Sequence, residues 1–199
     1  MNYISQRPLI LIFFCASLIL LSLPPFGISI FYWISLSLFF LYLLNNNDFS
    51  KKIVFLFFFI FQFISLIWIV QSFYSGGSFY LILGIILVLA LTSFISLINF
   101  FAVFLTYKVF KFSQLNFFLL PLSLSTVELF KEFFLGGFPW NPAAIIYYKN
   151  IWVLKLLPYV GVYGLGVIIH LILGAFLYSI VKTKKILTYF IAVLILLIS

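Results

Sequence analysis

Charged residues are scarce in this sequence: Asp, Glu, Lys and Arg make up only 7% of its 199 residues, whereas 66% are hydrophobic. A soluble domain usually has about 25% charged residues. A chain with so few charges has too little polar surface to cover itself in water. We therefore exclude an ordinary soluble domain and expect lipid to be the solvent of this chain.

Cysteine and histidine are nearly absent, with Cys15 and His170 the single residue of each type. One cysteine excludes an intrachain disulfide, and one Cys with one His does not make a metal site. Cys15 lies in an apolar run with no Lys or Glu nearby in sequence to activate its thiol. We interpret it as a small buried apolar residue, and we expect no catalytic residue, metal or cofactor in this chain.

Acidic residues are also few, three against eleven basic ones, which gives a net charge of +8. A basic soluble domain would suggest a nucleic-acid partner. Here the basic residues stand singly or in pairs between long apolar runs, so they are better interpreted as signals of membrane topology. We expect no binding to nucleic acid.

Long apolar runs dominate the chain instead. A membrane-spanning helix needs about 20 mostly apolar residues, and backbone groups in lipid must be satisfied within the segment, which favours helices. The alternating polarity of a β-barrel strand is absent. We predict an all-α, polytopic transmembrane bundle in a single domain, 1–199, with an external loop at 132–155 and about seven helices, at 8–23, 27–44, 53–72, 79–105, 115–131, 156–181 and 186–199.

The distribution of basic residues predicts the orientation of these helices. With a cytoplasmic N-terminus, only Lys131, Lys149 and Lys155 lie outside, and the inner side carries more basic residues, as the positive-inside rule requires. The last run of about 14 residues would span roughly 21 Å, less than a bilayer core of about 30 Å. We expect this run either to lie at the membrane interface or to belong to a polypeptide that once continued outward. The predicted inner residues are Arg7, Lys51, Lys52, Lys108, Lys111, Lys182, Lys184 and Lys185.

Most of the polar residues with a functional interpretation lie near the end of the fifth run. Glu128, Lys131 and Glu132 have the spacing i, i+3, i+4 and share one helix face, and the helix-breaking sequence 136–140 follows. One interpretation is a polar group that meets a phospholipid headgroup, beside a loop that holds lipid. The other is a structural ion pair, followed by a turn whose Trp140 is anchored in the headgroup belt.

Further along, His170 lies between Gly166 and Gly174 at intervals of four residues. Small residues let another helix approach closely, so we expect His170 to form a hydrogen bond across helices. A proton relay is the alternative function for it. Gln62, Gln71 and Asn99 are similarly expected to form hydrogen bonds between helices.

Several of these motifs together resemble the membrane-embedded N-terminal half of the bacterial apolipoprotein N-acyltransferases. The family has a Glu-x-x-Arg stretch followed by Gly-Phe-Pro-Trp, and then a Pro-x-x-Gly-Val-Tyr-Gly segment. The resemblance covers nearly the whole chain in order. It rests on Glu128 and Lys131, Gly137-Phe138-Pro139-Trp140, Leu157-Pro158-Tyr159-Val160-Gly161-Val162-Tyr163-Gly164, Leu23-Pro24-Pro25-Phe26-Gly27 and Trp68.

The resemblance implies a bacterial inner-membrane protein whose partners are a phospholipid acyl donor and the diacylglyceryl-cysteine of an apolipoprotein. In the family, a nitrilase-like domain with a Glu-Lys-Cys triad forms an acyl-thioester and passes the acyl group to the amine. That domain is missing here, so we expect the chain to be inactive alone, as a fragment or a truncated gene product. The implied substrate or lipid contacts are Glu128, Lys131, Gly137, Phe138, Pro139 and Trp140.

Two departures from the family pattern bear on these contacts. Lys131 replaces an Arg and lacks its planar, two-pronged guanidinium group, and Glu132 stands where the family usually has Gly. Two alternative functions remain open. The chain is a non-catalytic membrane anchor for a separately encoded partner, or a small transporter, which would require paired broken helices with polar residues at mid-membrane.

Overall fold

The computed structural model describes residues 8–45, 50–110, 113–134, 136–137 and 140–183. All the regular secondary structure in this part of the chain is helical, which confirms the predicted all-α class. It contains seven α-helices, one of them only four residues long, together with two 3-10 helices and a π-helical turn. The order is α1 Pro8–Leu20, α2 Ile30–Asn45, α3 Lys51–Leu66, η1 Ile67–Gly76, α4 Ser78–Phe110, α5 Asn116–Phe134, η2 Ala143–Tyr147, α6 Ile151–Leu154, α7 Leu157–Tyr178 and η3 Ser179–Thr183.

The helices begin and end within a few residues of the expected positions in most places, and two differences, in α5 and α7, affect the candidate site. Helix α5 continues to Phe134, so the first residues of the loop expected at 132–155 are helical, and that loop also contains η2 and α6. The backbone of α7 departs from helical geometry at Gly161, where φ is 68°, and the helix is kinked there. The predicted helix 186–199 lies outside the described residues, as do Arg7, Lys111, Lys184 and Lys185.

Three helical segments of the described chain are long and apolar enough to cross a membrane: Lys51–Tyr74, Ser78–Phe110 and Leu157–Lys182. Helices α1 and α2 are shorter and apolar. At about 1.5 Å per residue, the 33 residues of α4 extend for about 50 Å, well beyond a hydrocarbon core of about 30 Å. Helix α4 must therefore tilt strongly in a bilayer or extend beyond it.

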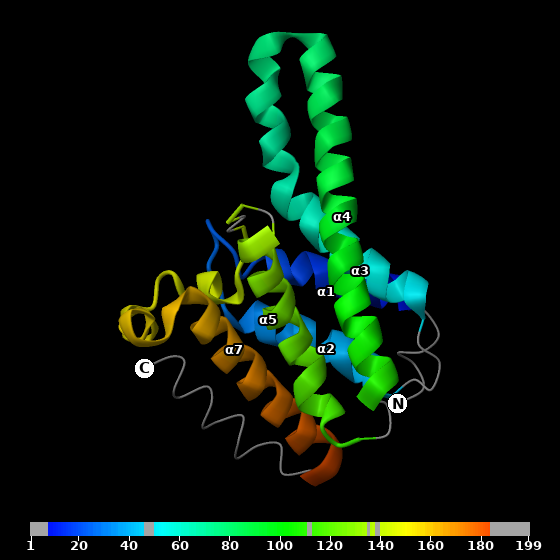
Figure 1. The fold of residues 1–199 in the computed structure, drawn as a ribbon, viewed down its shortest axis with the longest axis vertical. Coiled ribbons are helices and arrows are strands. Elements are labelled where there is room, and N and C mark those ends of the chain that lie inside the picture. The colour runs from blue at the N-terminus through cyan, green and yellow to red at the C-terminus, as the bar shows by residue number, and fades with distance from the viewer. Residues whose placement is uncertain (1–7, 46–49, 111–112, 135, 138–139, 184–199) are drawn as a thin grey trace.

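The first span and α4 form a helical hairpin that projects from the rest of the bundle (Figure 1). Its turn is at Gly77, where φ is 87°. The two legs pack closely because Gly84 has no side chain: an added Cβ would lie 2.8 Å from the ring of Phe73. Tyr74 and Phe79, near the tip, are largely exposed. The hairpin thus presents an apolar surface that lipid or protein must cover.

The remaining helices form the bundle that carries the candidate site. Helix α5 packs between α4 and α7, and α1 packs against α2 and α3. At Gly174, an added Cβ would lie 2.8 Å from the Cα of Phe118, so the glycine permits close contact between α7 and α5. This contact holds α7 against the start of α5, and Gly166 lies against Glu128 nearer the end of α5.

Candidate functional site

Two charged residues near the end of α5 bind the backbone of the chain that follows the helix. Both Glu128 and Lys131 are buried, with 7% and 5% of their surface exposed. The N–H of Ala143 donates to Glu128 Oε1 at 2.8 Å, and Lys131 Nζ donates to the carbonyl oxygen of Trp140 at 3.2 Å. Residues 140–143, which we call the tethered segment, are therefore held at both ends by side chains of α5.

Glycines end α5 and turn the chain toward this segment. Gly136 has a φ of 64°, in the left-handed region that favours glycine, and the N–H of Gly137 donates to the carbonyl of Glu132 at 2.9 Å. A bond of this span with a left-handed glycine is typical of a helix C-terminus. Of the predicted contact residues, Phe138 and Pro139 lie outside the described residues.

The other side of the tethered segment contacts the helical hairpin. Asn141 Nδ2 donates to Ser65 Oγ at 2.9 Å, and the ring of Trp140 packs edge-to-face on that of Trp68, with centroids 5.2 Å apart. Trp68 and Trp140 both belong to the motifs that carry the family resemblance. The structure brings them together, although Trp140 remains 40% exposed.

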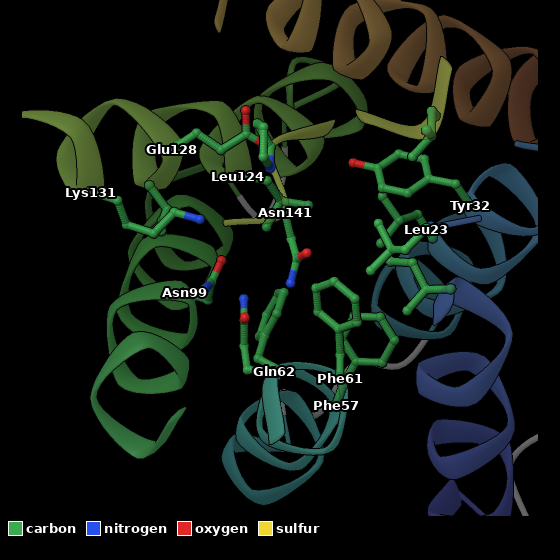
Figure 2. Close-up of a pocket in the computed structure, with 16 residues that line it drawn as sticks. Leu23, Tyr32, Phe57, Phe61, Gln62, Asn99, Leu124, Glu128, Lys131 and Asn141 are labelled. Carbon is green, nitrogen blue, oxygen red and sulfur yellow. The ribbon is translucent and has the colours of Figure 1, made fainter. Parts of the chain in front are cut away.

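A cavity lies between the tethered segment and helices α2, α3, α4 and α5 (Figure 2). It is small, with about 40 Å³ of space that a water-sized sphere can occupy. Polar side chains form one part of its wall, and several of them converge toward its centre, whereas the opposite part is apolar. The polar part is formed by Gln62, Asn99, Glu128, Lys131 and Asn141, and the opposite part by Leu23, Phe57 and Phe61 together with Tyr32. Leu36 and Phe58 also line the cavity.

Only one of the two carboxylate oxygens of Glu128 accepts a hydrogen bond from the described residues. Oε2 is buried and accepts no hydrogen bond from any described residue. It lies against Gly166 of α7, where an added Cβ would be 2.8 Å away. A buried polar atom without a partner costs free energy unless water, a proton or a ligand satisfies it. The site therefore contains one acceptor that remains available.

Glu132 faces α7 rather than the cavity. The hydroxyl of Tyr163 donates to Glu132 Oε2 at 2.5 Å. Glu128, Lys131 and Glu132 all lie on α5 at the predicted spacing. Each side chain nevertheless has a different partner. Tyr163 and Gly166 are about one turn apart on α7, so both glutamates of α5 contact this helix.

His170 connects three helices in the interior. Its Nε2 lies 2.7 Å from Tyr32 Oη of α2, and its Nδ1 lies 2.6 Å from Ser125 Oγ of α5. The predicted hydrogen bonds across helices are thus confirmed for His170, whose side chain is fully buried. The prediction is wrong for Asn99, whose Nδ2 donates to the carbonyl of Ile95 in its own helix at 3.0 Å.

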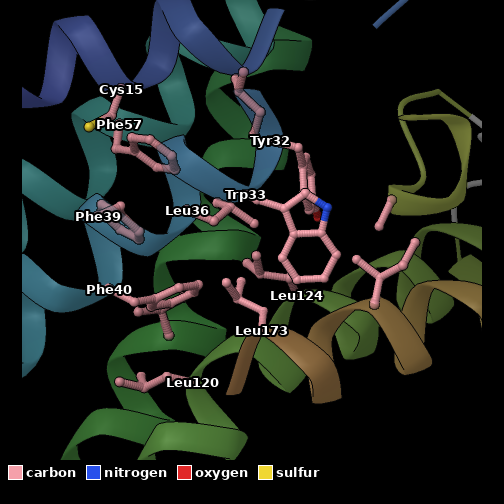
Figure 3. Close-up of a cluster of buried hydrophobic side chains, with 14 of the residues drawn as sticks. Cys15, Tyr32, Trp33, Leu36, Phe39, Phe40, Phe57, Leu120, Leu124 and Leu173 are labelled. Carbon is pink, nitrogen blue, oxygen red and sulfur yellow. The ribbon is translucent and has the colours of Figure 1, made fainter. Parts of the chain in front are cut away.

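The apolar wall of the cavity continues into the hydrophobic core (Figure 3). Phe39 and Phe57 stack there with ring centroids 4.0 Å apart. Trp33 Nε1 donates to Tyr147 Oη at 2.9 Å and so links α2 to η2. Burial raises the pKa of Tyr147 well above its ordinary value, so its hydroxyl stays neutral. The core thus gives the chain that follows the tethered segment a rigid support.

Cys15 is fully buried in α1, as predicted. Within the described ranges, no three His, Cys, Asp or Glu side chains come together in a group that would hold a metal ion.

A comparison with models of protein families gives a match. The family model described as the apolipoprotein N-acyltransferase N-terminal domain matches residues 15–175. The matched range contains the cavity, the tethered segment and both tryptophans that meet at its edge. No curated protein matches the chain.

Proposed function

Because the chain belongs to the apolipoprotein N-acyltransferase family, whose N-terminal membrane domain it contains, we propose that it binds the phospholipid that donates the acyl group. The family acylates lipoproteins using phospholipids and is found in the bacterial inner membrane. The resemblance predicted from the motifs is thus confirmed. The proposal concerns which part of this domain holds the lipid.

The chemistry of the reaction defines what the membrane domain must supply. A thiolate attacks an ester carbonyl of the phospholipid, which forms a thioester and releases a lysophospholipid. The amino group of the diacylglyceryl-cysteine then attacks the thioester, forms the amide and releases the thiol. Cys15, the sole cysteine of this chain, is buried in α1. We propose that the domain binds and orients lipid for a nitrilase-like domain and is inactive without it.

The observation that carries the proposal is the tethered segment at the mouth of a cavity with one polar and one apolar wall. A phospholipid has the same division, because its headgroup and glycerol esters accept hydrogen bonds and its acyl chains do not. Trp140 directly precedes Asn141, which lines this cavity, and its ring packs on that of Trp68, so the two rings offer apolar surface next to the tethered segment. We propose that Gly137, Phe138, Pro139 and Trp140 form one wall of the lipid site.

Glu128 and Lys131 serve this site in two ways. Their hydrogen bonds to the backbone of Trp140 and Ala143 fix the position of the wall. Lys131 lines the cavity and has further protons to donate, whereas Glu128 Oε2 is buried against Gly166 of α7 and accepts no hydrogen bond from the described chain. Lys131 is therefore suited to donate to a headgroup or glycerol oxygen, while Glu128 holds the backbone of the wall.

We place the N-terminus in the cytoplasm and the tethered segment on the outer side. The described basic residues support this orientation. Lys51 and Lys52 at the start of α3, Lys108 in the last turn of α4 and Lys182 after α7 lie at the predicted inner end. The fewer basic residues of the 131–155 region lie at the other end, as the positive-inside rule requires.

Acyl transfer by a fusion tests the lipid site. The chain would be joined to a nitrilase-like domain from a family member and assayed with phospholipid and a diacylglyceryl-cysteine peptide. Trp140→Ala is expected to raise KM on the order of tenfold, because it removes apolar surface from the lipid wall. Phe133→Ala, which removes an exposed ring elsewhere on α5, is the matched control and should keep the parent rate.

Variants of Glu128 separate its two roles. Glu128→Gln keeps an oxygen that accepts from Ala143, whereas Glu128→Leu removes it. If the hydrogen bond to the backbone matters most, the Gln variant keeps most of the activity and the Leu variant loses it. Parent rates for both Trp140→Ala and Glu128→Leu, at equal protein levels, would show that this region does not bind the donor lipid.

A further inference from the structure

A second surface of the domain lies around α6, away from the cavity. Helix α6 ends at Leu154, and the candidate span Leu157–Lys182 begins three residues later. Residues next to the end of a spanning helix lie at the level of the lipid headgroups. This part of the chain exposes large apolar and aromatic side chains, with Trp152 63% exposed and Ile151, Leu156 and Tyr159 also exposed.

Two lysines flank these apolar residues. The ammonium group of Lys155 lies 4.3 Å from the ring centroid of Trp152. Lys149 Nζ donates to the carbonyl oxygens of Pro25 at 3.2 Å and Phe26 at 2.8 Å. An ammonium group has three protons, so Lys149 retains one for another acceptor.

Neither lysine is neutralised by the described part of the chain. Both described glutamates have other partners, because Glu128 accepts from Ala143 and Glu132 from Tyr163. The side chains of Lys149 and Lys155 are exposed. The surface therefore has an uncompensated positive charge directly beside apolar rings.

An open groove runs between the turn that precedes α2 and the start of α6. Its two sides are fixed to each other, because Tyr148 Oη donates to the carbonyl of Pro25 at 3.0 Å and the Tyr148 ring packs on Gly27. The groove encloses about 690 Å³, including its open side, and is lined by Gly27, Ser29, Ile146, Tyr147, Lys149, Asn150, Ile151 and Trp152.

We propose that this surface binds the headgroup of an anionic phospholipid, at a site separate from the acyl-donor cavity. The phosphodiester oxygens accept from Lys149 in the groove and from Lys155 beside Trp152. The acyl chains continue along Ile151, Leu156 and Tyr159 toward the hydrocarbon core. A lipid leaflet matches this surface because it places negative charge next to apolar chains at this depth.

The site also has a consequence for α7. A lipid held at Lys149 and Lys155 contacts the chain on both sides of α6, immediately before the kink of α7 at Gly161. It would anchor this end of α7 at the interface, and α7 in turn packs on Glu128 through Gly166. The proposal rests on the surface around α6 and does not depend on the lipid wall at Trp140.

A fluorescent reporter at the surface tests the proposal. Leu156→Cys in a Cys15→Ser background would carry an environment-sensitive dye, and the protein would be placed in nanodiscs of phosphatidylcholine with rising fractions of phosphatidylglycerol. We expect a saturable change in emission. A basic residue near an anionic surface contributes about 1 kcal/mol, or about fivefold, so Lys155→Gln should raise the half-saturating fraction about fivefold, and Lys155→Arg should not.

Lys155→Gln is the decisive variant, because Lys149→Gln also removes the hydrogen bonds to Pro25 and Phe26. Lys108→Gln, at the far end of α4, is the control and should match the parent. The proposal fails if Lys155→Gln titrates like the parent or if Lys108→Gln weakens binding equally. It also fails if soluble glycerol phosphate gives the same change in dye emission as phosphatidylglycerol. A change in emission that occurs only after a catalytic domain is added would likewise contradict it.

Discussion

Replacing Gly166 with alanine should displace the Glu128 carboxylate and loosen the tethered segment. The new Cβ would lie 2.8 Å from Glu128 Oε2 and 3.8 Å from Ala143 Cβ. The carboxylate either stays under compression, which costs about 1–3 kcal/mol, or moves and loses its bond to Ala143, which costs about 1.5–3 kcal/mol. Alanine favours a helix by about 0.5–1 kcal/mol. The expected net loss of stability is about 1–2 kcal/mol.

Gly164→Ala is the matched control for this change. It lies on the same helix and gains the same helix propensity, but the nearest atom to its Cβ would be Val160 Cβ at 3.2 Å. Unfolding of both variants in mixed detergent micelles would give the difference between them. A cysteine at position 140, in the Cys15→Ser background, would report whether the tethered segment becomes more accessible to a thiol reagent.

A double-mutant cycle connects the effect to the carboxylate. Glu128→Asp shortens the side chain by one methylene, so it should make room for the alanine and reduce the cost of Gly166→Ala. Equal stability of the Gly166→Ala and Gly164→Ala variants, together with unchanged thiol accessibility, would refute the packing of Glu128 on α7 and the tether that depends on it.

Two further predictions follow from the buried network and the charge distribution. His170→Ala should destabilise the bundle by about 1–3 kcal/mol, because it leaves the hydroxyls of Tyr32 and Ser125 without their partner; His170→Gln should cost less, and equal unfolding of the Ala variant and the parent would contradict the network. Cysteines replacing Lys155 and Lys182, each in the Cys15→Ser background, should react differently with an impermeant thiol reagent in intact cells. Position 155 should be labelled and position 182 protected, and the reverse pattern would rule out a cytoplasmic N-terminus.

The helices of this chain were predictable because their apolar runs are long and are separated by strong breakers. The end of α5 illustrates this, since Gly136 and Gly137 supply the left-handed backbone that the turn requires. Hydropathy did not predict the change from α3 to the 3-10 helix η1 at Ile67. Both helix types need the same apolar residues, and they differ in hydrogen-bond register rather than in composition.

The contacts of the candidate site residues were not predictable from the sequence. Spacing and motif selected Glu128, Lys131 and Trp140, yet no local pattern shows that the two charges bind backbone groups after the turn. The partners of His170 were unpredictable for the same reason. Tyr32 lies on α2, far away in sequence, and only the packing of α2 on α7 brings the two side chains together.

The tethers at the end of α5 also determine which substitutions the segment tolerates. Lys131 binds the carbonyl oxygen of Trp140, an atom that every amino acid has, so the path of the backbone there does not depend on the side chain. Glu128 needs the N–H of Ala143, which excludes proline, and the buried Ala143 side chain leaves no room for a larger one. Position 140 can therefore accept other side chains while the backbone keeps its path, whereas position 143 is restricted to small residues.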